Sequence, residues 1–566
     1  MPTDPARATR SRQKDVRVPV SSAAPEGSQA PDSEGAPVSA VVVLAAGEGK
    51  RMRSSRSKLL HEIGGRSMLG YAVDAANELQ PEHVVVVVGH LREQVEAHLA
   101  EIAPHVTTVV QTEQRGTGHA VQVALDALPA LEGDVLVTYG DVPMLTTETL
   151  AALVADHRAT GTAVSVLTAR VADPTGYGRI VRGAGGEVLA IVEERDATSE
   201  QRAITEINSG IYVFAPDALR DGLARLRPTN DQGELYLTDV LAFAREAGRE
   251  VGAFQTSDVW QTEGVNDRVQ LARMSAEVNR RTLERWMRAG VTVVDPASTW
   301  VHASVDLAED VTLLPGTSLE GATSVRAGAT IGPDTTLVDV EVGEGATVVR
   351  THGSLSVVGP GASVGPYAYL RPGTVLGERG KIGTFVETKN ATIGARAKVP
   401  HLTYAGDVEV GEDANIGAGV IFANYDGVTK ARTRVGRASF VGSDSTLVAP
   451  LTVADGAYVG AGSTVTGDVG PGELAVSRGR QRNVPGWVAR KRAGTKTAAA
   501  AEAAGAGGPE ASADDGPVAP PELEQHVAPA PLTDQEVVRA SDPLDASSDP
   551  SNNPSNDPRT DIERES

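Results

Sequence analysis

Three short polar segments each follow an aliphatic run and carry residues suited to binding phosphate or a metal ion. The first, residues 44–58, contains Gly47 and Gly49, which let backbone N–H groups approach an anion closely, and the cations Arg51 and Lys58. It lacks the third glycine of a dinucleotide-binding fingerprint and the Gly-Lys-Ser/Thr ending of a P-loop. Taken alone, this segment is either a phosphate-binding loop or an ordinary strand-to-helix turn.

The other two segments extend this pattern. Residues 111–120 contain glycines and open a helical pattern, so they offer a second place where backbone donors can meet a ligand. Asp141 follows the aliphatic run 135–139. A carboxylate at the end of a buried strand can hold Mg²⁺, which takes one or two carboxylates together with substrate phosphates. The simpler alternatives are a flexible turn and a carboxylate that caps a turn.

The elements that must position these segments alternate along the chain. Aliphatic runs and helical patterns follow one another over residues 38–44, 68–79, 82–89, 91–102, 106–110, 119–128 and 135–139. Continuously apolar strands that alternate with helices predict an α/β domain with a mostly parallel sheet covered on both faces. Ligands of such sheets bind at the carboxyl ends of the strands, where all three polar segments would lie.

A different pattern fills the C-terminal half. Aliphatic residues recur every six positions at Val435, Val441, Leu447, Val453, Val459 and Val465, and the same spacing recurs with breaks from Ile331 onward. Six is neither the helix period nor the strand period, and it is typical of a parallel β-helix built from hexapeptides. Each hexapeptide would form one face of a triangular prism with its aliphatic residue inside. The alternative is a β-sandwich whose spacing arises by chance.

Composition limits the class of protein. The 566 residues are too many for one domain, and a net charge of −22 argues against a nucleic-acid partner, which would require a basic surface. The absence of cysteine excludes disulfides and cysteine nucleophiles and is compatible with the cytosol. No apolar run is long enough for a membrane span, and residues 1–19 lack the apolar core of a secretory signal. We therefore expect a cytoplasmic protein with neither a nucleic-acid nor a membrane partner.

Together, these motifs resemble a known family. The three loops look like those of the sugar-1-phosphate nucleotidyltransferases. With the six-residue repeat behind them, residues 38–492 closely resemble the bacterial bifunctional N-acetylglucosamine-1-phosphate uridylyltransferase/glucosamine-1-phosphate acetyltransferase family. The resemblance implies a Rossmann-like nucleotidyltransferase domain followed by a left-handed parallel β-helix that forms a homotrimer. It implies acetyl transfer from acetyl-CoA to glucosamine-1-phosphate, then uridylyl transfer from UTP, which yields pyrophosphate and UDP-N-acetylglucosamine for cell-wall synthesis.

For the uridylyltransferase site, the resemblance implies that Asp141 and Asn266 hold one or two Mg²⁺ ions. The nucleotide and the N-acetylated sugar would be bound by Leu44, Ala45, Ala46, Gly47, Arg51, Lys58, Gln111, Gly116, Thr117, Tyr139, Gly140, Asp141, Gly178, Glu193, Asn208 and Asn266. Two positions depart from the family, because Lys50 stands where it usually has threonine and Ser57 where it usually has proline. Both flank the phosphate loop, so they put triphosphate affinity in doubt.

For the acetyltransferase site, the resemblance makes His401 the general base that deprotonates the amine of glucosamine-1-phosphate. Histidine suits this role because imidazole ordinarily titrates near neutral pH. Glucosamine-1-phosphate would be bound by Arg371, Lys389, Tyr404, Asn415 and Lys430, and acetyl-CoA by Ala418, Asn424, Tyr425, Ser443, Ala461 and Arg478. The basic stretch 478–492 could also meet CoA phosphates, or it could be a solvated end of the chain.

We expect five segments along the chain. These are a disordered arm at 1–37, a uridylyltransferase domain at 38–267, a linker helix within 268–295, a β-helix acetyltransferase domain with a basic arm at 296–492, and a disordered acidic tail at 493–566. The helical pattern within 268–290 could instead be a core helix of the first domain.

Two other functions fit the same architecture. One is a monofunctional nucleotidyltransferase with a purely structural β-helix, and the joint presence of Arg371, Lys389, His401 and Asn424 argues against it. The other is a non-catalytic scaffold, which would not need Lys58, Asp141 and Asn266 together.

Overall fold

The computed structural model describes residues 37–228, 233–479 and 481–505. The arm expected over 1–37, apart from its last residue, and most of the tail expected over 493–566 lie outside these residues. The chain divides into two units, residues 1–479 and residues 480–566, which are described separately. None of the helices within the described ranges is long and apolar enough to cross a membrane.

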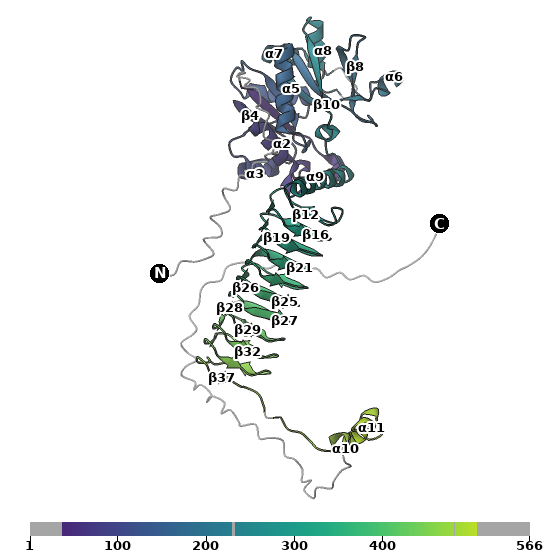
Figure 1. Ribbon diagram of the computed structural model, residues 1–566. Coiled ribbons are helices and arrows are strands. Elements are labelled where there is room, and N and C mark those ends of the chain that lie inside the picture. The colour runs from purple at the N-terminus through teal and green to yellow at the C-terminus, as the bar shows by residue number, and fades with distance from the viewer. Residues whose placement is uncertain (1–36, 229–232, 480, 506–566) are drawn as a thin grey trace, which may run out of the picture. The chain divides into compact units, whose positions relative to one another are not determined.

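The first unit begins with a nine-stranded sheet in the order β11-β7-β10-β6-β1-β4-β5. The sheet and its helices form the purple to teal part of the chain (Figure 1). Its strands are β1 (Ala40–Ala45), β4 (His83–Val88), β5 (Thr107–Val110), β6 (Val135–Tyr139), β7 (Val164–Arg170), β8 (Gly178–Arg182), β9 (Val188–Val192), β10 (Glu206–Phe214) and β11 (Val251–Gln255). The four strands expected from the aliphatic runs are parallel neighbours, which confirms the prediction of a mostly parallel sheet. β10 runs antiparallel to β6 and β7, and the hairpin of β8 and β9 extends from it.

Helices cover both faces of this sheet. They are α2 (Met68–Glu78), α3 (Arg92–Ile102), α4 (Thr117–Asp126), α5 (Thr147–Thr160), the single turn α6 (Ser199–Arg202), α7 (Pro216–Arg225) and α8 (Asp239–Glu246). Along β1, Ala40, Val42 and Leu44 pack in the core shared with α4, α7 and α8, whereas Val41, Val43 and Ala45 pack in the core shared with α2, α3 and α5. Burial on both faces explains why the strand is apolar at every position.

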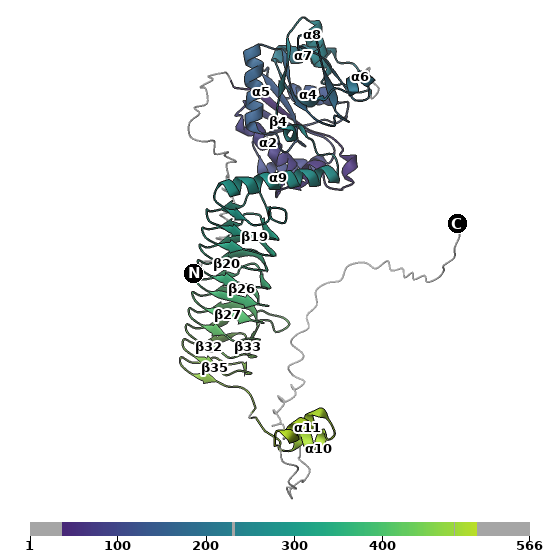
Figure 2. The same ribbon diagram turned by 45° about the vertical axis from the view of Figure 1, so that its right-hand side comes forward.

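The helix α9 (Arg268–Arg288) follows the sheet, as the sequence predicts. Asp267 caps it by accepting hydrogen bonds from the N–H groups of Val269 and Gln270, both at 2.9 Å. Near its middle, the amide of Asn279 donates to the carbonyl oxygen of Thr299 at 2.8 Å and accepts from the N–H of Val301 at 3.0 Å. The helix is thereby fixed to the beginning of the repeat region (Figure 2).

The repeat region is a stack of short parallel strands, which confirms the parallel β-helix. It runs from β12 (Thr292–Val293) to β37 (Leu474–Ala475), so the strand ladder begins slightly before residue 296. Thr312 pairs with Thr330, 18 positions on, and Thr330 with Thr347, 17 positions on. Thr347 in turn pairs with Ser363, 16 positions on, so one coil is three hexapeptides or one or two residues less. The shorter coils explain the breaks in the six-residue spacing.

The aliphatic residues of the repeat form one continuous core. The six repeat residues from Val435 to Val465 are all buried and belong to a single cluster that extends back to Leu283 of α9. Each coil covers the aliphatic row of the next, so the stack is stabilised by contacts between neighbouring coils. One insertion interrupts it, because Asn415 pairs with Phe440, 25 positions on, and a loop closed by a bridge between Tyr425 and Lys430 lies between them.

The second unit contains two short helices, α10 (Trp487–Lys491) and α11 (Lys496–Ala503). The helix α11 differs from the disorder expected for residues 493–566. Its sequence contains four successive alanines, which have the highest helix propensity, and Thr495 caps it by accepting from the N–H of Ala498 at 3.2 Å. These residues were expected to belong to the disordered tail, whereas their alanines favour a helix.

Candidate functional site

The first cluster of polar residues lies where β1 and β6 end. The N–H of Gly140 donates to the carbonyl oxygen of Leu44 at 3.0 Å, which aligns the ends of the two strands. Asp141 follows at once, and its carbonyl oxygen accepts from the N–H of Val265 at 3.0 Å. The segment that leads into α9 is thereby held at the same edge of the sheet, as expected for an α/β fold.

Lys58, Asp141 and Asn266 meet at this edge. The ammonium of Lys58 lies 2.5 Å from Oδ2 of Asp141 and 3.2 Å from Oδ1 of Asn266. The side chains of Lys58 and Asp141 are only 12% and 17% exposed. Two oxygens therefore face one point where a cation already lies. The described ranges contain no group of three or more His, Cys, Asp or Glu side chains arranged to hold a metal. The carboxylate of Asp141 and the amide oxygen of Asn266 are the groups at this edge that could hold a metal ion.

The glycine loop packs directly on Lys58. Gly49 has a φ of +61°, and a Cβ there would lie 2.8 Å from the Cβ of Lys58, so only glycine fits without displacement. The amide of Gln114 donates to the carbonyl oxygen of Ala46 at 2.7 Å and joins this loop to the second glycine segment. Open space surrounds Gly47.

Lys50 and Ser57, which depart from the family pattern, each interact with another residue. Lys50 forms an ion pair with Glu48. Ser57 is buried, and its N–H donates to Oε1 of Gln94 in α3 at 2.9 Å. Proline, which lacks the N–H, could not form this hydrogen bond.

The second glycine segment is held by its own hydrogen bonds. The amide of Gln111 donates to the carbonyl oxygen of Gly116 at 3.1 Å, and the hydroxyl of Thr117 accepts from the N–H of Leu237 at 3.1 Å. A Cβ at Gly116 would lie 2.6 Å from the carbonyl oxygen of Leu235. Glycine is required there because the segment packs against the backbone before α8.

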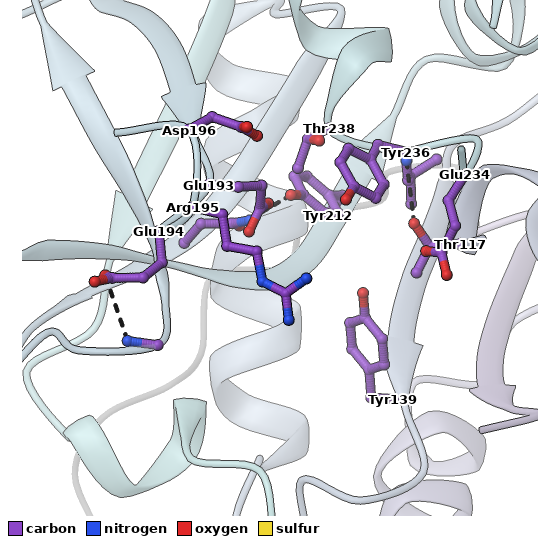
Figure 3. Close-up of a pocket in the computed structure, with 13 residues that line it drawn as sticks. Thr117, Tyr139, Glu193, Glu194, Arg195, Asp196, Tyr212, Glu234, Tyr236 and Thr238 are labelled. Atoms are coloured by element: carbon purple, nitrogen blue, oxygen red, sulfur yellow. Dashed lines mark hydrogen bonds between the residues drawn. The ribbon is translucent and has the colours of Figure 1, made fainter. Parts of the chain in front are cut away.

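A cavity of about 460 Å³ adjoins these segments (Figure 3). Its lining residues are Thr117, Tyr139, Gly176, Glu193, Glu194, Arg195, Asp196, Asn208, Tyr212, Glu234, Tyr236, Leu237 and Thr238. The family resemblance implies that four of them bind ligand, namely Thr117, Tyr139, Glu193 and Asn208. The cavity is large enough for a small molecule, and polar side chains dominate its wall.

The wall of the cavity is preorganised by internal contacts. Oδ1 of Asn208 accepts from the hydroxyl of Tyr212 at 2.9 Å. Gly178 pairs with Asn208 across β8 and β10, and a Cβ at Gly178 would lie 3.3 Å from Oε1 of Glu193. Burial and neighbouring carboxylates raise the pKa of Glu193 and of Tyr139.

The second cluster lies on the β-helix and is strongly basic. Lys389 in β26 (Glu387–Ile393) lies beside Lys430 of the insertion, and the charge of Lys430 lowers the pKa of Lys389. An anion between the two ammonium groups would relieve their repulsion. Arg371 forms an ion pair with Glu387 at 2.8 Å, and Tyr404 pairs with Glu387 on the next strand. A phosphate bound by Arg371 would have to share the guanidinium with Glu387.

The insertion is fastened to the coil by Asp407. Its two carboxylate oxygens accept from the amide of Asn424 at 2.5 Å and from the amide of Asn390 at 3.0 Å. Tyr425 is exposed, and its hydroxyl donates to the carbonyl oxygen of Gly427 at 2.6 Å. Asn424 is thus held in one orientation, while Tyr425 is held by its own loop.

His401 ends β27 (Lys398–His401) and is exposed. Its carbonyl oxygen accepts from the hydroxyl of Thr403 at 2.8 Å and from the N–H of Gly419 at 3.3 Å. Its imidazole forms no hydrogen bond with any other residue in the described part of the chain. Asn415 lies on the next strand, in register with Lys398. The backbone of His401 is therefore fixed, whereas nothing within one chain orients its ring.

Small residues lie at one corner of successive coils, and the family resemblance implies that three of them line the acetyl-CoA channel: Ala418, Ser443 and Ala461. The N–H of Asp444 donates to the carbonyl oxygen of Ala418, and the N–H of Gly462 to that of Ser443, both at 2.8 Å. These bonds stack the three residues along the coil. Arg478 lies beyond the last strand and is exposed.

Comparison with known proteins identifies the family. A family profile described as the MobA-like NTP transferase domain matches residues 41–245. The chain is 56% identical over 470 residues to "Bifunctional protein GlmU" of Corynebacterium efficiens, covering 82% of this chain and 97% of that protein. It is 58% identical to the protein of the same description in Rhodococcus opacus over 483 residues, covering 84% and 96% of the two chains. The Streptomyces coelicolor relative is 56% identical over 466 residues, covering 82% and 97%.

The chain belongs to the bifunctional GlmU family. Membership confirms the resemblance seen in the sequence and makes the protein a bifunctional enzyme of UDP-N-acetylglucosamine synthesis, an acetyltransferase and uridylyltransferase. The monofunctional and scaffold alternatives are not favoured. Nucleotide and acyl-CoA substrates follow from this membership, as does the divalent metal that nucleotidyltransferases generally use.

Several residues that shape the two clusters have no signal in the sequence. Gln94 holds the backbone of Ser57 beside Lys58, Glu387 holds Arg371, and Asp407 holds Asn424, yet none of the three belongs to a glycine loop. Tyr212 and Arg195 line the cavity from β10 and from the segment after β9. Tyr212 could have been found only from the strand pairing that brings β10 beside β6.

Proposed function

We propose that the uridylyltransferase reaction takes place at the carboxyl edge of the nine-stranded sheet within residues 38–267, and the acetyltransferase reaction on the β-helix within residues 296–492. One observation carries the proposal, namely that the expected site residues form two clusters on different elements. Lys58, Asp141 and Asn266 meet at the sheet edge, while Lys389 and Lys430 meet on the coil.

At the sheet edge, the phosphate of N-acetylglucosamine-1-phosphate attacks the α-phosphorus of UTP, and pyrophosphate leaves. No protein nucleophile is needed, so binding, positioning and charge neutralisation supply the catalysis. Arg51 and Lys58 bind the triphosphate, and the backbone of residues 44–47 cradles the nucleotide. Gln111, Gly116 and Thr117 bind uracil and its ribose. Support for this arrangement comes from the packing of the glycine loop on Lys58.

Asp141 and Asn266 would hold Mg²⁺ in this site. Their oxygens face the point where the Lys58 ammonium lies, which supports a cation site built from two protein oxygens and completed by phosphates. When bound, the ion neutralises charge on the phosphate oxygens.

The cavity next to this edge would bind the N-acetylated sugar through Glu193 and Asn208, with Tyr139 in its wall. Gly178, which pairs with Asn208, and Gly140, which follows Tyr139, would contribute beside it. Its volume of about 460 Å³ and its polar wall support this role. The shared interactions of Asn208 and Tyr212 leave the cavity shape fixed before a ligand arrives.

On the β-helix, the amine of glucosamine-1-phosphate attacks the thioester carbon of acetyl-CoA, and the CoA thiolate leaves. His401 accepts the proton that the amine nitrogen loses. Arg371, Lys389 and Lys430 bind the sugar phosphate, and the repulsion between the two lysines supports an anion there. Tyr404, Asn415 and Asn424 hold the sugar and acetyl group. The corner residues Ala418, Ser443 and Ala461, with Tyr425 and Arg478, line the CoA channel.

In this proposal the enzyme acts in the cytoplasm, because UTP and acetyl-CoA are cytoplasmic metabolites. It is also a homotrimer. A row of apolar side chains at one corner of successive coils supports assembly: Tyr367, Phe385 and Leu402 are 54%, 59% and 59% exposed. The N–H of Phe385 donates to the carbonyl oxygen of Tyr367 at 3.1 Å, and their rings stack with centroids 5.5 Å apart. Exposed apolar rows of this kind mark interfaces. Leu402 follows His401, so the neighbouring subunit would complete the acetyltransferase site.

The decisive experiment is to assay each half-reaction separately on the purified full-length protein. Uridylyl transfer is followed by pyrophosphate release, and acetyl transfer by release of the CoA thiol. Both reactions should proceed with glucosamine-derived phosphates. Loss of either reaction in a folded protein would contradict the assignment of that cluster.

A further inference from the structure

Residues 54–57 connect the glycine loop to Lys58, and one side chain from a distant helix holds their backbone. Gln94 lies in the first turn of α3 and uses both ends of its amide. Its Oε1 accepts from the N–H of Ser57 at 2.9 Å, and its Nε2 donates to the carbonyl oxygen of Ser55 at 3.0 Å. The amide thus pairs with the segment as a neighbouring strand would.

No other element shares this task in the part of the chain that the structure describes. The remaining hydrogen bonds of the 54–57 backbone are local, from the N–H of Arg56 to the hydroxyl of Ser54 at 3.1 Å and from the N–H of Leu60 to the carbonyl oxygen of Ser57 at 3.1 Å. The hydroxyl of Ser57 caps nothing, although the residue is buried. The path of the chain into Lys58 therefore depends on the Gln94 amide.

The contact with Gln94 determines the position of Lys58. It begins the short 3₁₀ helix Lys58–Leu60 directly after Ser57, and its ammonium reaches 2.5 Å from Asp141. The Cβ of Lys58 also packs on Gly49, so the position of its backbone sets the spacing between the cation and the glycine loop. A shift of Ser57 would move the Lys58 ammonium relative to Asp141 and to the glycine loop.

We propose that Gln94 is a positioning residue for the uridylyltransferase, which fixes the backbone of Ser55 and Ser57 so that Lys58 meets the triphosphate. This inference rests on the proposed role of Lys58 as a triphosphate ligand. In this chain the group that matters is the N–H of Ser57, which the proline usual in the family lacks, rather than the serine side chain. Gln94 itself does not touch the substrate.

The two partners allow a test with a matched control. Ser57 has a φ of −53° and a ψ of 139°, and this φ is one that proline adopts, so Ser57→Pro removes the N–H with little demand on the backbone. Ser57→Ala keeps the N–H and removes only the hydroxyl. Gln94→Leu removes both hydrogen bonds from the other side.

Initial rates of uridylyl transfer measured against UTP and against N-acetylglucosamine-1-phosphate give the readout. We expect Gln94→Leu and Ser57→Pro each to raise KM for UTP roughly three- to tenfold, the size expected for losing one or two neutral hydrogen bonds. KM for the sugar phosphate and the rate of acetyl transfer should stay within about twofold of wild type. Ser57→Ala should match wild type. Combining Gln94→Leu with Ser57→Pro should add little to the larger single effect, because both break the same contact.

Lys58→Ala separates failure of this inference from failure of the proposed site. If Lys58→Ala leaves uridylyl transfer unchanged, the assignment of Lys58 falls and the inference with it. If Lys58→Ala impairs the reaction while Gln94→Leu only lowers the melting temperature, Gln94 is a structural residue and the inference alone is overturned. A rise in KM for UTP in Ser57→Ala equal to that in Ser57→Pro would also overturn it.

Discussion

Lys58 and Asp141 are separated by 83 residues in the chain, yet the ammonium of Lys58 lies 2.5 Å from a carboxylate oxygen of Asp141. Both side chains are largely shielded from water, and the amide oxygen of Asn266 is the third member of the group. In such a setting each charge stabilises the other, and the removal of one leaves a buried charge without its partner. The pair joins the loop after β1 to the loop after β6.

Replacement of Asp141 by alanine should abolish uridylyl transfer and spare acetyl transfer. The variant loses the carboxylate proposed to hold the metal, and we expect a decrease in the uridylyl-transfer rate of at least about 10²-fold. Acetyl transfer should remain within about twofold of wild type, because its residues lie on the β-helix. Separate assays of the two half-reactions check this, with Asp126→Ala, an exposed position in α4, as the control. Equal loss of both activities in a folded protein would refute two independent sites.

Glu206 should make the stability of the first domain depend on pH. Burial raises the pKa of Glu206, but hydrogen bonds from Arg182 and Thr168, together with the charges of Arg182 and Arg170, outweigh it and lower the pKa overall. Arg182 binds both carboxylate oxygens, at 2.7 and 2.8 Å. A lowered folded-state pKa contributes stability above the unfolded value of about 4.3, and this contribution is lost as the pH falls through the folded-state pKa.

Glu206→Gln should therefore destabilise the protein at pH 7 by roughly 1.5–3 kcal/mol, the contribution of hydrogen bonds to a charged group. The difference in melting temperature between wild type and variant should shrink as the pH is lowered from 7 to 3. Thermal unfolding followed by circular dichroism measures both, with the exposed Glu132→Gln as the control. A difference that stays constant down to pH 3 would show that the charge of Glu206 does not matter.

Local sequence patterns predicted the fold well because each buried position requires an apolar residue, and the spacing of buried positions is visible in the sequence. Val41 and Val42 of β1 face opposite cores, so an apolar residue at every position indicated a sheet covered on both faces. In the coil, Val441 and Val459 are buried because the prism turns every six residues. The antiparallel strand β10 was not predicted, since strand pairing depends on distant segments. The helix α11 was not predicted, since its alanines were assigned to the disordered tail.

Some site residues could also be recognised from local sequence, whereas others depend on contacts with distant parts of the chain. Gly49 and Asp141 stand at strand ends and could be found from the sequence alone. Gln94 and Asp407 could not, because each acts through a contact with a residue far along the chain, and an isolated glutamine or aspartate carries no periodic signal. The roles of His401 and the corner residues came only from family resemblance, and they stay predictions.

Replacement of His401 by alanine should remove the general base without affecting the fold. The imidazole forms no hydrogen bond with the other described residues, so its loss leaves no unpaired partner in the chain. Acetyl transfer should fall by about 10²–10⁴-fold, and uridylyl transfer should not change. His352→Ala, at another exposed histidine of the coil, serves as the control in a thiol-release assay. Wild-type acetyl transfer by His401→Ala would remove this residue from the mechanism.

Introduction of a charge at Phe385 should separate the subunits and, with them, the acetyltransferase activity. Phe385 is 59% exposed in the single chain and stacks on Tyr367 in the apolar row that ends at Leu402. If this row is the trimer interface, Phe385→Glu would bury an unpaired carboxylate, which costs several kcal/mol. Because His401 precedes Leu402, dissociation should also remove the groups that a neighbouring subunit contributes beside the base.

Light scattering and the two activity assays on the same samples decide this. Phe385→Glu should be monomeric at concentrations where wild type is trimeric, with acetyl transfer reduced in proportion and uridylyl transfer retained, because the sheet edge lies far from the row along the chain. Ile102→Glu introduces the same charge at an exposed apolar residue of α3 and should alter neither assembly nor activity. A monomer with full acetyl transfer would refute a shared site, and a trimer that tolerates Glu at position 385 would place the interface elsewhere on the coil.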